Sequence, residues 1–469
     1  MTYDQAVHEL FSLGKELASP RQPALSSAPG ARVQKFGLEN ISLLAEALGR
    51  PHLAVPCVHI AGTNGKGSTA AMLESILRAA DFRTGLYTSP HLETINERIR
   101  INGQDISDED FAAAWSKVHS TIESLMASGK LAAHPTFFEC VTAMAFVTFA
   151  SHAVQFAIYE VGLGGRFDAT NIVAPEVAVI TAIDFDHENY LGHSIELIAA
   201  EKAGIIKPGA IVISASQRPE ARAVITTQAT KMCAHLTEVD SAFRLEDQQN
   251  SRGLYRAKAV STDSRKSLSL KLAPCLPGAF QIRNALTAAT TAVLVSERGF
   301  YVEPVAIERG IATANWPGRL ERLAEHPALY LDGTHNPSGA RELLKFWQEN
   351  FAGRKIFLVY GAMRDKAVDE IAGLLFPHAE TVILTEPRQP RAISASLLAE
   401  IIGHHAKQVE IVPDPAAALE RALARARPDH AVFATGSLYL VGDLLSYWHQ
   451  RKNPPAPAPN ATATPNFRP

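Results

Sequence analysis

Cysteine is scarce in this sequence, and its cysteines are widely separated. Cys57, Cys140, Cys233 and Cys275 are the four, and no two of them form a C-x-x-C pair. A disulfide framework or a cysteine-based zinc site would need a recognisable spacing, so neither is indicated. We expect a reducing, cytoplasmic environment.

An excess of positive charge and long apolar runs are missing as well. The net charge is -3 and the sequence pI is near 6.6, and no cluster of Lys and Arg is interleaved with aromatic residues. No uncharged run reaches membrane-spanning length, and the segment 1–17 carries acidic residues where an export signal would be basic and then apolar. We therefore expect no nucleic-acid or membrane partner, and small molecules are favoured.

What the sequence does contain is a regular alternation of strand-like and helix-like segments. Of its 469 residues 46% are hydrophobic, enough for a substantial core and for more than one domain. Short apolar runs precede amphipathic stretches, as in "CVHIAG" followed by "STAAMLESILRAA". This alternation predicts an α/β fold with a mostly parallel sheet.

The alternation is interrupted twice, which suggests the domain organisation. Between residues 240 and 277 it weakens, and we predict a peripheral sheet there; it restarts after a connector that contains Pro and Gly. We assign residues 1–315 to a P-loop-containing N-terminal domain, 316–327 to the connector and 328–450 to a smaller Rossmann-like α/β C-terminal domain. Residues 451–469 are rich in Pro and Ala, and we expect them to be disordered.

A glycine-rich segment follows the strand-like run "CVHIA". It consists of Gly62, Thr63, Asn64, Gly65, Lys66, Gly67 and Ser68. Its backbone N–H groups and a helix opening at Ser68 would bind phosphate oxygens, and Lys66 would neutralise charge during phosphoryl transfer. The spacing departs from G-x-x-x-x-G-K-[ST], because Ile60 replaces the first Gly and Gly67 follows Lys66. A tight turn with an exposed lysine is the alternative.

Candidate magnesium ligands stand at the ends of three other predicted strands. Glu160 ends the run "FAIYE", while Asp184, Asp186 and His187 follow "VAVITAI". Ser89 and His91 follow a third extended run. Each could be ordinary turn chemistry, but ligands of open α/β sheets collect at the carboxyl ends of strands, which favours a common site.

Lys202 occupies an unusual position in a predicted helix. Ile195, Ile198, Ala199 and Lys202 fall at i, i+3, i+4 and i+7, so the lysine shares the apolar face. It could lie along that face with its amine in water. Alternatively, a desolvated and partly neutral amine could react with CO2 to form a carbamate that orients a second Mg²⁺.

Further polar residues follow strand-like runs in the second half. Asp332, His335 and Asn336 come after "ALYL" and could face the first domain. Arg364, Lys366, Ser437 and Tyr439 lie in similar loops, where helix caps and solvated side chains are common.

The motifs together resemble the folylpolyglutamate synthase and dihydrofolate synthase family, relatives of the Mur ligases. The matching segments run in family order from about residue 35 to residue 445: "AGTNGKGST", "YTSPHLETINERI", "TFFE", "EVGLGGRFDATN", "HENYLGHSIELIAAEKAGI", "QIRNA", "WPGRLE", "LDGTHNPSGA" and "TGSLYLVGDLL". G-T-N-G-K-G-[ST] is the form expected of this family.

The resemblance implies ATP-dependent amide formation, in which a folate or pteroate carboxylate is activated as an acyl phosphate and then attacked by L-glutamate. It implies Mg²⁺, two ions by our expectation, ATP as co-substrate, a carbamylated lysine and a monomer. Lys66, Lys202 and His187 would be catalytic, and the phosphate loop would bind ATP together with Asn284, Arg319 and Asp332. Ser89, Glu160, His187 and carbamylated Lys202 would hold metal. The folate or pteroate would lie near Lys35, Phe36, Gly37, Thr136, Phe137, Phe138, Glu139, Phe167, Asp168 and Ala169, and glutamate near His335 and Ser437.

Two departures from the family pattern bear on the substrate. Many members that accept dihydropteroate have Asp-Leu-Gly where this chain has Lys35, Phe36 and Gly37, so a carboxylate that could hold the pterin ring is missing. Thr334 replaces the more usual Ala. We expect a folylpolyglutamate synthase that also acts as a dihydrofolate synthase.

Two other functions stay open. A Mur-type ligase for a UDP-sugar would carry a UDP-binding domain before the phosphate loop, and only 61 residues precede Gly62. A P-loop phosphotransferase or nucleotide switch would leave the apolar setting of Lys202 unexplained.

Overall fold

The structure is a computed structural model that describes residues 1–14, 37–265 and 267–452. Its largest sheet has eight strands, which are β1 (Cys57–Ala61), β2 (Thr84–Tyr87), β3 (Ile99–Ile101), β4 (Gln104–Asp105), β5 (Phe156–Glu160), β6 (Val177–Ile180), β7 (Ile211–Ser214) and β8 (His235–Glu238). The strand order is β4-β3-β2-β5-β1-β6-β7-β8. β3 pairs antiparallel with both β2 and β4, and the other strand pairs are parallel, so the predicted mostly parallel sheet is confirmed.

Helices cover both faces of this sheet. They are α1 (Tyr3–Ser12), α2 (Glu39–Ala47), α3 (Lys66–Ala79), α4 (Asp108–Ala127), α5 (Phe137–Ser151), α6 (Glu188–Leu191), α7 (Ile195–Ala203), α8 (Pro219–Lys231), α9 (Val239–Ala242), α10 (Phe280–Glu297) and α11 (Pro304–Thr313). Because side chains alternate along a strand, Val58 and Ile60 of β1 pack toward α3, α10 and α11, whereas Cys57 packs toward α4 and α5. Both faces are therefore apolar, as a buried parallel sheet requires.

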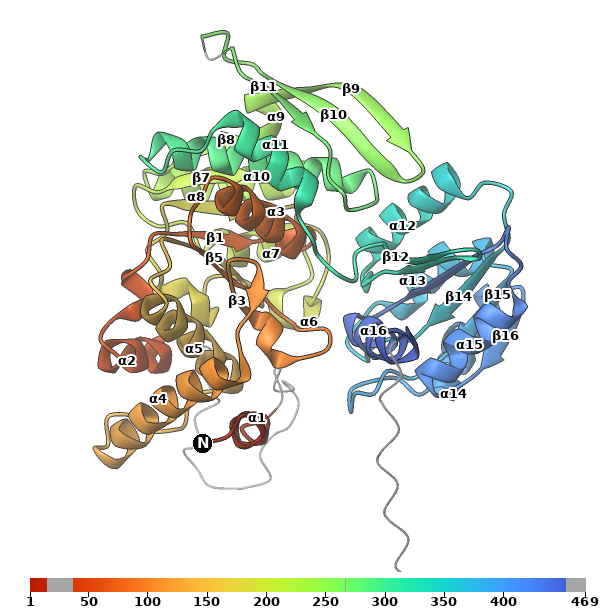
Figure 1. The fold of residues 1–469 in the computed structure, drawn as a ribbon, viewed down its shortest axis with the longest axis horizontal. Coiled ribbons are helices and arrows are strands. Elements are labelled where there is room, and N and C mark those ends of the chain that lie inside the picture. The colour runs from red at the N-terminus through yellow and green to blue at the C-terminus, as the bar shows by residue number, and fades with distance from the viewer. Residues whose placement is uncertain (15–36, 266, 453–469) are drawn as a thin grey trace, which may run out of the picture.

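A small antiparallel sheet lies beyond α10 and α11. It contains β9 (Phe243–Ser251), β10 (Leu254–Ser261) and β11 (Ser269–Leu272) in the order β11-β10-β9, which confirms the predicted peripheral sheet. Figure 1 shows its β9–β10 end reaching toward α12 (Pro337–Asn350) of the second domain. There the hydroxyl of Tyr255 donates to the carboxylate of Glu349.

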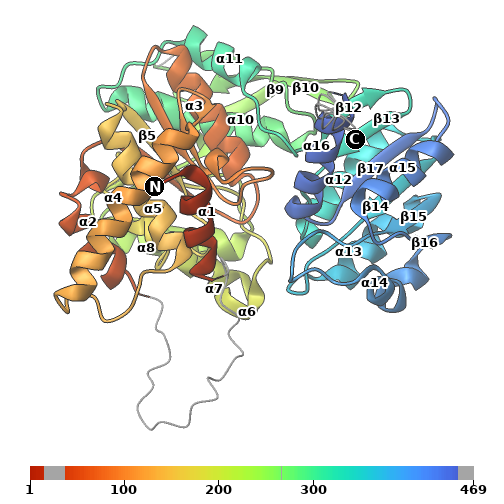
Figure 2. The same cartoon turned by 60° about the horizontal axis from the view of Figure 1, so that its bottom comes forward.

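The second domain is built on a six-stranded sheet and lies beside the first domain (Figure 2). Its strands are β12 (Glu321–Glu325), β13 (Ala328–Leu331), β14 (Ile356–Tyr360), β15 (Thr381–Leu384), β16 (Val409–Ile411) and β17 (Ala431–Thr435), and besides α12 its helices are α13 (Val368–Leu375), α14 (Ala395–Ile402), α15 (Pro415–Arg425) and α16 (Leu438–Lys452). The order is β12-β13-β17-β14-β15-β16, parallel apart from β12. One apolar cluster includes residues of α12 to α14 and another includes residues of α15 and α16. The predicted α/β fold with two sheets is thus confirmed.

Two elements lie at the boundaries of the sequence-based assignment. β12 is formed by residues that we assigned to the connector, and it pairs with β13 at the edge of the second sheet. α16 continues to Lys452, and the rest of the predicted tail lies outside the described residues. In the described part of the chain, no helix has the length and apolar character that a membrane crossing requires.

Candidate active site

The phosphate loop follows β1, which lies between β5 and β6 in the sheet. The loops after these three parallel strands therefore open at one edge, where ligands of such sheets bind. Gly65 has a φ of +86° and caps α3, and a Cβ atom there would collide with the side-chain oxygen of Asn284. α3 begins at Lys66, two residues before the predicted start at Ser68. The backbone N–H groups of its first turn are thus available to an anion.

Lys66 is half-buried and lies near charges of both signs. Its Nζ donates to the backbone oxygen of Thr63 at 3.2 Å. Burial lowers the pKa of Lys66, and the charges of Glu160 and Asp186 oppose that shift. Burial likewise lowers the pKa of Arg319, opposed by Asp332 and Glu160. Two cations and a carboxylate from three separate segments therefore meet beside the phosphate loop.

Glu160 ends β5 and is almost completely buried. Its Oε2 accepts the backbone N–H of Ser89 at 3.2 Å, so these two predicted magnesium ligands lie together. Burial raises the pKa of Glu160, while Lys66 and the Ser89 N–H favour its charged form. No hydrogen bond or ion pair joins Glu160 to His187 among the residues that the structure describes.

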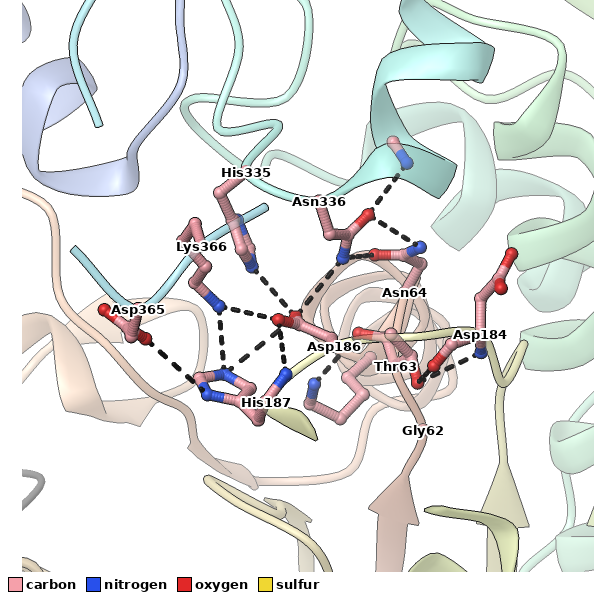
Figure 3. Close-up of polar contacts among 12 residues, drawn as sticks. Gly62, Thr63, Asn64, Asp184, Asp186, His187, His335, Asn336, Asp365 and Lys366 are labelled. Atoms are coloured by element: carbon pink, nitrogen blue, oxygen red, sulfur yellow. Dashed lines mark hydrogen bonds and ion pairs between the residues drawn. The ribbon is translucent and has the colours of Figure 1, made fainter. Parts of the chain in front are cut away.

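Asp186 is one of the points at which the two domains meet (Figure 3). Its Oδ1 lies 2.7 Å from Nζ of Lys366 and accepts the backbone N–H of His187 at 2.8 Å. Its Oδ2 lies 3.3 Å from Nε2 of His335 and accepts from the Asn336 amide at 3.2 Å. One carboxylate from the first domain thus contacts three side chains of the second.

This environment keeps Asp186 charged. Burial acts to raise its pKa, but the hydrogen bond from His335 and the positive charge of Lys366 outweigh burial and hold the pKa well below its usual range. Since both oxygens already have protein partners, the carboxylate acts here as an interdomain anchor.

His187 is held in a strained position next to this anchor. Its φ is +51°, in the left-handed region that is uncommon for a residue other than Gly. Its Nε2 lies 3.2 Å from Nζ of Lys366, and its Nδ1 is buried without a hydrogen-bond partner among the described residues. Burial lowers the pKa of His187 to about 3, so the imidazole is neutral and has a lone pair to offer.

Lys202 is buried, as its spacing in α7 predicted, with 5% of the residue exposed. Its Nζ donates to the backbone oxygen of Gly62, the first residue of the phosphate loop, at 2.7 Å. Burial, followed by the charge of Lys66, lowers the pKa of Lys202 to about 7. A large fraction of this amine is therefore neutral near neutral pH.

Two contacts tie the phosphate loop to its surroundings. The hydroxyl of Thr63 donates to the backbone oxygen of Asp184 at 2.9 Å. The Asn336 amide donates to Oδ1 of Asn64 at 2.9 Å, and Oδ1 of Asn336 caps α12 by accepting the Gly339 N–H. The first turn of α12 is thereby linked to the phosphate loop, as Figure 3 shows.

A cavity of about 290 Å³ opens beside these contacts and is lined by both domains. Its walls include Asp186, His187, His335, Arg364 and Lys366. Ser437, the other predicted glutamate-binding residue, is buried two residues after β17, and its hydroxyl accepts the backbone N–H of Tyr439. β17 lies next to β13, so Ser437 and His335 follow neighbouring strands.

The connector also approaches the phosphate loop. A Cβ atom on Gly67 would collide with the indole of Trp316, over which the guanidinium of Arg100 lies at 4.9 Å. Asp332 accepts the backbone N–H of Leu320 at 2.8 Å and so fixes the end of the connector. Arg319 and Asp332, two of the predicted nucleotide contacts, are thus brought to the same place.

The residues predicted to border the pteroate surround the start of α5. Thr136 caps this helix, and the Glu139 carboxylate accepts the Thr136 N–H and hydroxyl, both at 2.8 Å. Phe137 is buried and stacks on Phe11, while Phe138 lies against Gly162 in the loop after β5. The polar atoms of Thr136 and Glu139 therefore serve the fold.

Three more of these residues follow β5 in the chain. Phe167 is 49% exposed, Ala169 is buried, and buried Asp168 accepts the backbone N–H groups of Gly162 and Leu163 at 3.0 Å. Gly37 is described, but Lys35 and Phe36 lie outside the described residues.

Some residues of the site were missed or misjudged in the sequence. Lys366 was interpreted as a residue of a solvated loop, which is wrong, since its side chain is 9% exposed and paired with Asp186. Asp365, whose Oδ2 lies 3.9 Å from Nδ1 of His187, was not considered. Trp316 was missed as well. The position of Lys366 after the carboxyl end of β14 was a usable signal for it.

The chain matches two family descriptions. Residues 60–292 match the Mur ligase middle domain, and residues 318–438 match the Mur ligase glutamate ligase domain. The chain is 36% identical to the dihydrofolate synthase/folylpolyglutamate synthase of Bacillus subtilis over 412 residues, which cover 87% of this chain and 94% of that protein. It is 32% identical to the Escherichia coli protein of the same name, over 89% of this chain and 92% of that one.

Solved structures agree with this match. Folylpolyglutamate synthase from Mycobacterium tuberculosis, complexed with ADP, superimposes with a TM-score of 0.84 at 30% identity, covering 95% of this chain and 98% of that one. E. coli FolC in complex with DHPP and ADP gives a TM-score of 0.79 at 29% identity, over 97% and 99% of the two chains.

Proposed function

The chain belongs to the folylpolyglutamate synthase and dihydrofolate synthase family of the Mur ligases, and we propose that it is an ATP-dependent ligase that adds L-glutamate to folates. The observation that carries this proposal is the meeting of two domains at one site. A phosphate loop with Lys66 lies on one side, and a cavity lined by His335, Arg364 and Lys366 lies on the other. Such a site can hold a nucleotide and an amino acid against each other.

The reaction has two steps. A carboxylate of the acceptor attacks the γ-phosphorus of ATP, and the bond from that phosphorus to the oxygen of the β-phosphate breaks. ADP is released, and the acceptor is now an acyl phosphate. The amine of glutamate then attacks the acyl carbon, loses a proton and expels phosphate. Lys66 and Arg319 would offset the negative charge of the phosphates, and the closed domains would exclude water from the acyl phosphate.

Magnesium fits the residues at the ends of β2, β5 and β6. Ser89 and Glu160 offer hard oxygens, and His187 offers the single lone pair of a neutral imidazole. We propose that these three hold Mg²⁺ and that carbamylated Lys202 orients a second ion. When bound, the metal would neutralise phosphate charge.

The carbamate rests on the state of the Lys202 amine. A buried amine with a pKa of about 7 is nucleophilic toward CO2, and its position under Gly62 places it beside the phosphate loop. Carbamylation would replace an ammonium group by an anion. An anion next to the positive charge of Lys66 is more favourable than a second ammonium group there.

The folate is proposed to lie between the first turn of α5 and the loop after β5, near Phe138, Phe167 and Ala169. These two segments would be held in place by the hydrogen bonds and packing of Thr136, Phe137, Glu139 and Asp168. We propose both dihydropteroate and reduced folates as acceptors. Asn284, Asp332 and residues Gly62 to Ser68 would contact ATP, and His335 and Ser437 would contact glutamate.

We further propose a cytoplasmic monomer with small-molecule partners, because one chain supplies both walls of the site. The domain division at residues 315 and 328 is proposed with it.

The test is phosphate release from ATP and glutamate in three reactions, one with dihydropteroate, one with tetrahydrofolate and one with a UDP-muramyl acceptor, followed by mass spectrometry of the product. We expect release with the first two and a product heavier by one glutamyl residue. Release with the UDP-muramyl acceptor alone would refute the folate assignment, and release without any acceptor would indicate a phosphotransferase.

A further inference from the structure

A second group of metal-binding side chains lies on the outer part of the first domain, away from the phosphate loop. His119 and Glu123 stand on α4, and His134 stands in the loop between α4 and α5. One donor atom of each lies within 4.8 Å of the other two. We propose that His119, Glu123 and His134 bind a Zn²⁺ ion, or a similar first-row transition metal, which fastens the α4–α5 loop to α4.

The spacing of the three residues suits one ion. His119 and Glu123 are four residues apart in a helix, so both side chains project from the same face. His134 reaches that face from the loop, which closes on the helix at this point. Zinc ligands about 2.1 Å from the metal lie roughly 3.5 Å apart, so small side-chain rotations are enough to close the group around an ion.

The hydrogen bonds of His134 prepare it as a ligand. Its Nδ1 lies 2.7 Å from the backbone oxygen of Pro135. A carbonyl oxygen can only accept, so Nδ1 carries the proton and Nε2 keeps its lone pair. A histidine ligand is commonly oriented in this way, by donating its other ring N–H to a backbone carbonyl.

His119 supplies the second observation. Its Nδ1 is buried and has no hydrogen-bond partner among the residues that the structure describes. The imidazole packs against Trp115 at a ring distance of 5.3 Å, so its position is set by packing and not by a hydrogen bond at Nδ1. Coordination through this atom would supply the missing partner.

The donor types decide the class of metal. Two imidazole nitrogens and one carboxylate are typical of Zn²⁺ and related borderline metals, whereas Mg²⁺ and Ca²⁺ prefer oxygen. Three protein ligands leave a fourth position for water. A second candidate group, Asp369, His404 and His405, is less suitable because Nε2 of His405 is already 2.9 Å from Oδ1 of Asp369.

The ion would act on the loop that leads into α5. His134 is two residues before Thr136, which caps α5. An ion that joins His134 to Glu123 and His119 would hold the two ends of the segment between them together. It would thereby restrict the open conformations of that segment. The exposed Lys130 lies inside that segment, so trypsin cleavage after Lys130 reports on the closure.

The experiment titrates untagged full-length protein with ZnCl2 in excess Mg²⁺. Zinc affinity is measured by competition with a chromophoric chelator, and the rate of trypsin cleavage after Lys130 is measured separately. The variants are H119A, E123Q and H134A. H404A is the matched control at the second group, and H187A controls for zinc in the active site. Glu123 is exposed, so E123Q preserves the fold.

We expect one zinc ion that survives H404A and H187A and that slows cleavage after Lys130. H119A and H134A should weaken this binding at least about tenfold and abolish the protection. The proposal is overturned if the unmodified chain and H119A bind zinc equally, if H404A alone removes the ion, or if bound zinc leaves cleavage after Lys130 unchanged.

Discussion

Lys366 and Asp186 form a buried ion pair that joins the two domains, with Nζ 2.7 Å from Oδ1 and each side chain 9% exposed. Lys366 follows β14 of the second sheet and Asp186 follows β6 of the first. A buried pair stabilises a contact only when further hydrogen bonds satisfy its members, and Asn336 and His187 supply two of these to the carboxylate. The pair therefore favours the closed arrangement of the domains.

Replacing Lys366 by Met should open the domains. The change removes the lysine partner of Asp186 and leaves the carboxylate with its hydrogen bonds from the second domain alone in the closed form. Removing one member of a buried ion pair costs roughly 3–5 kcal/mol. Opening allows water to reach Asp186, so the domains should separate while each stays folded. Small-angle X-ray scattering should show a larger radius of gyration, and kcat should fall strongly.

Lys355→Met is the matched control for that change. Lys355 pairs with Glu380 at the surface of the second domain, with side-chain exposures of 55% and 36%. Surface pairs contribute between zero and about 1 kcal/mol, so neither the scattering nor the turnover should change. Equal effects of the two substitutions would contradict the role given to Lys366.

Local patterns in the sequence predicted two features of the site. The burial of Lys202 followed from its i, i+3, i+4, i+7 spacing with Ile195, Ile198 and Ala199, because helix periodicity is a local property. Glu160 at the end of β5 followed from a strand-like apolar run in the same way.

The interdomain contacts could not be found by such patterns. Asp186 and Lys366 are 180 residues apart in the chain, and each alone resembles a loop residue. Their burial depends on the angle between two domains, which no short segment encodes. β12 was missed for a related reason, since its charged residues form a strand only at the edge that β13 provides.

Removing the amine of Lys202 should separate catalysis from nucleotide binding. Lys202→Ala deletes the proposed carbamate but leaves Lys66 and the phosphate loop, so turnover should fall far more than ATP affinity. A small carboxylate such as formate should restore part of the activity by replacing the anion. Steady-state rates and calorimetric ATP titration check this, and a fully active variant would end the carbamate hypothesis.

A methyl group at Gly67 should disturb the contact between the phosphate loop and the connector. The added Cβ would lie 2.8 Å from the indole nitrogen of Trp316, closer than real Cβ contacts. Gly67→Ala should therefore displace Trp316 or α3, weaken ATP binding and lower the melting temperature.

Gly373→Ala is its control within a helix. Gly373 lies in α13, and its added Cβ would meet no atom closer than 3.6 Å. An exposed helical Gly replaced by Ala usually stabilises by about 0.5–1 kcal/mol, so ATP binding should be unchanged and the melting temperature equal or slightly higher. A Gly67→Ala protein with normal ATP affinity would refute the contact's importance.

Acid should destabilise the protein through a histidine remote from the solvent. His59 of β1 is fully buried, and its Nε2 lies 2.8 Å from the hydroxyl of Thr170, which itself donates to Asp168. The single hydroxyl proton is thus used, so Nε2–H of His59 must be the donor and Nδ1 would take any further proton. Nδ1 is buried without a partner among the described residues, and burial lowers the pKa of His59 to about 3.

The direction of the pH effect follows from that shift. The unfolded chain takes up a proton at His59 below pH of about 6.5, whereas the folded protein does not until pH falls to about 3. Stability is therefore lost as pH falls through this window, by about 2 kcal/mol between pH 7 and pH 5. His59→Gln keeps an N–H group for Thr170 but cannot be protonated. In urea unfolding at pH 7 and pH 5, the free energy of unfolding of this variant should fall by about 2 kcal/mol less than that of the unmodified protein. The control His235→Gln changes an exposed residue and should behave like the unmodified protein. An equal loss in all three proteins would show that the buried imidazole does not govern acid sensitivity.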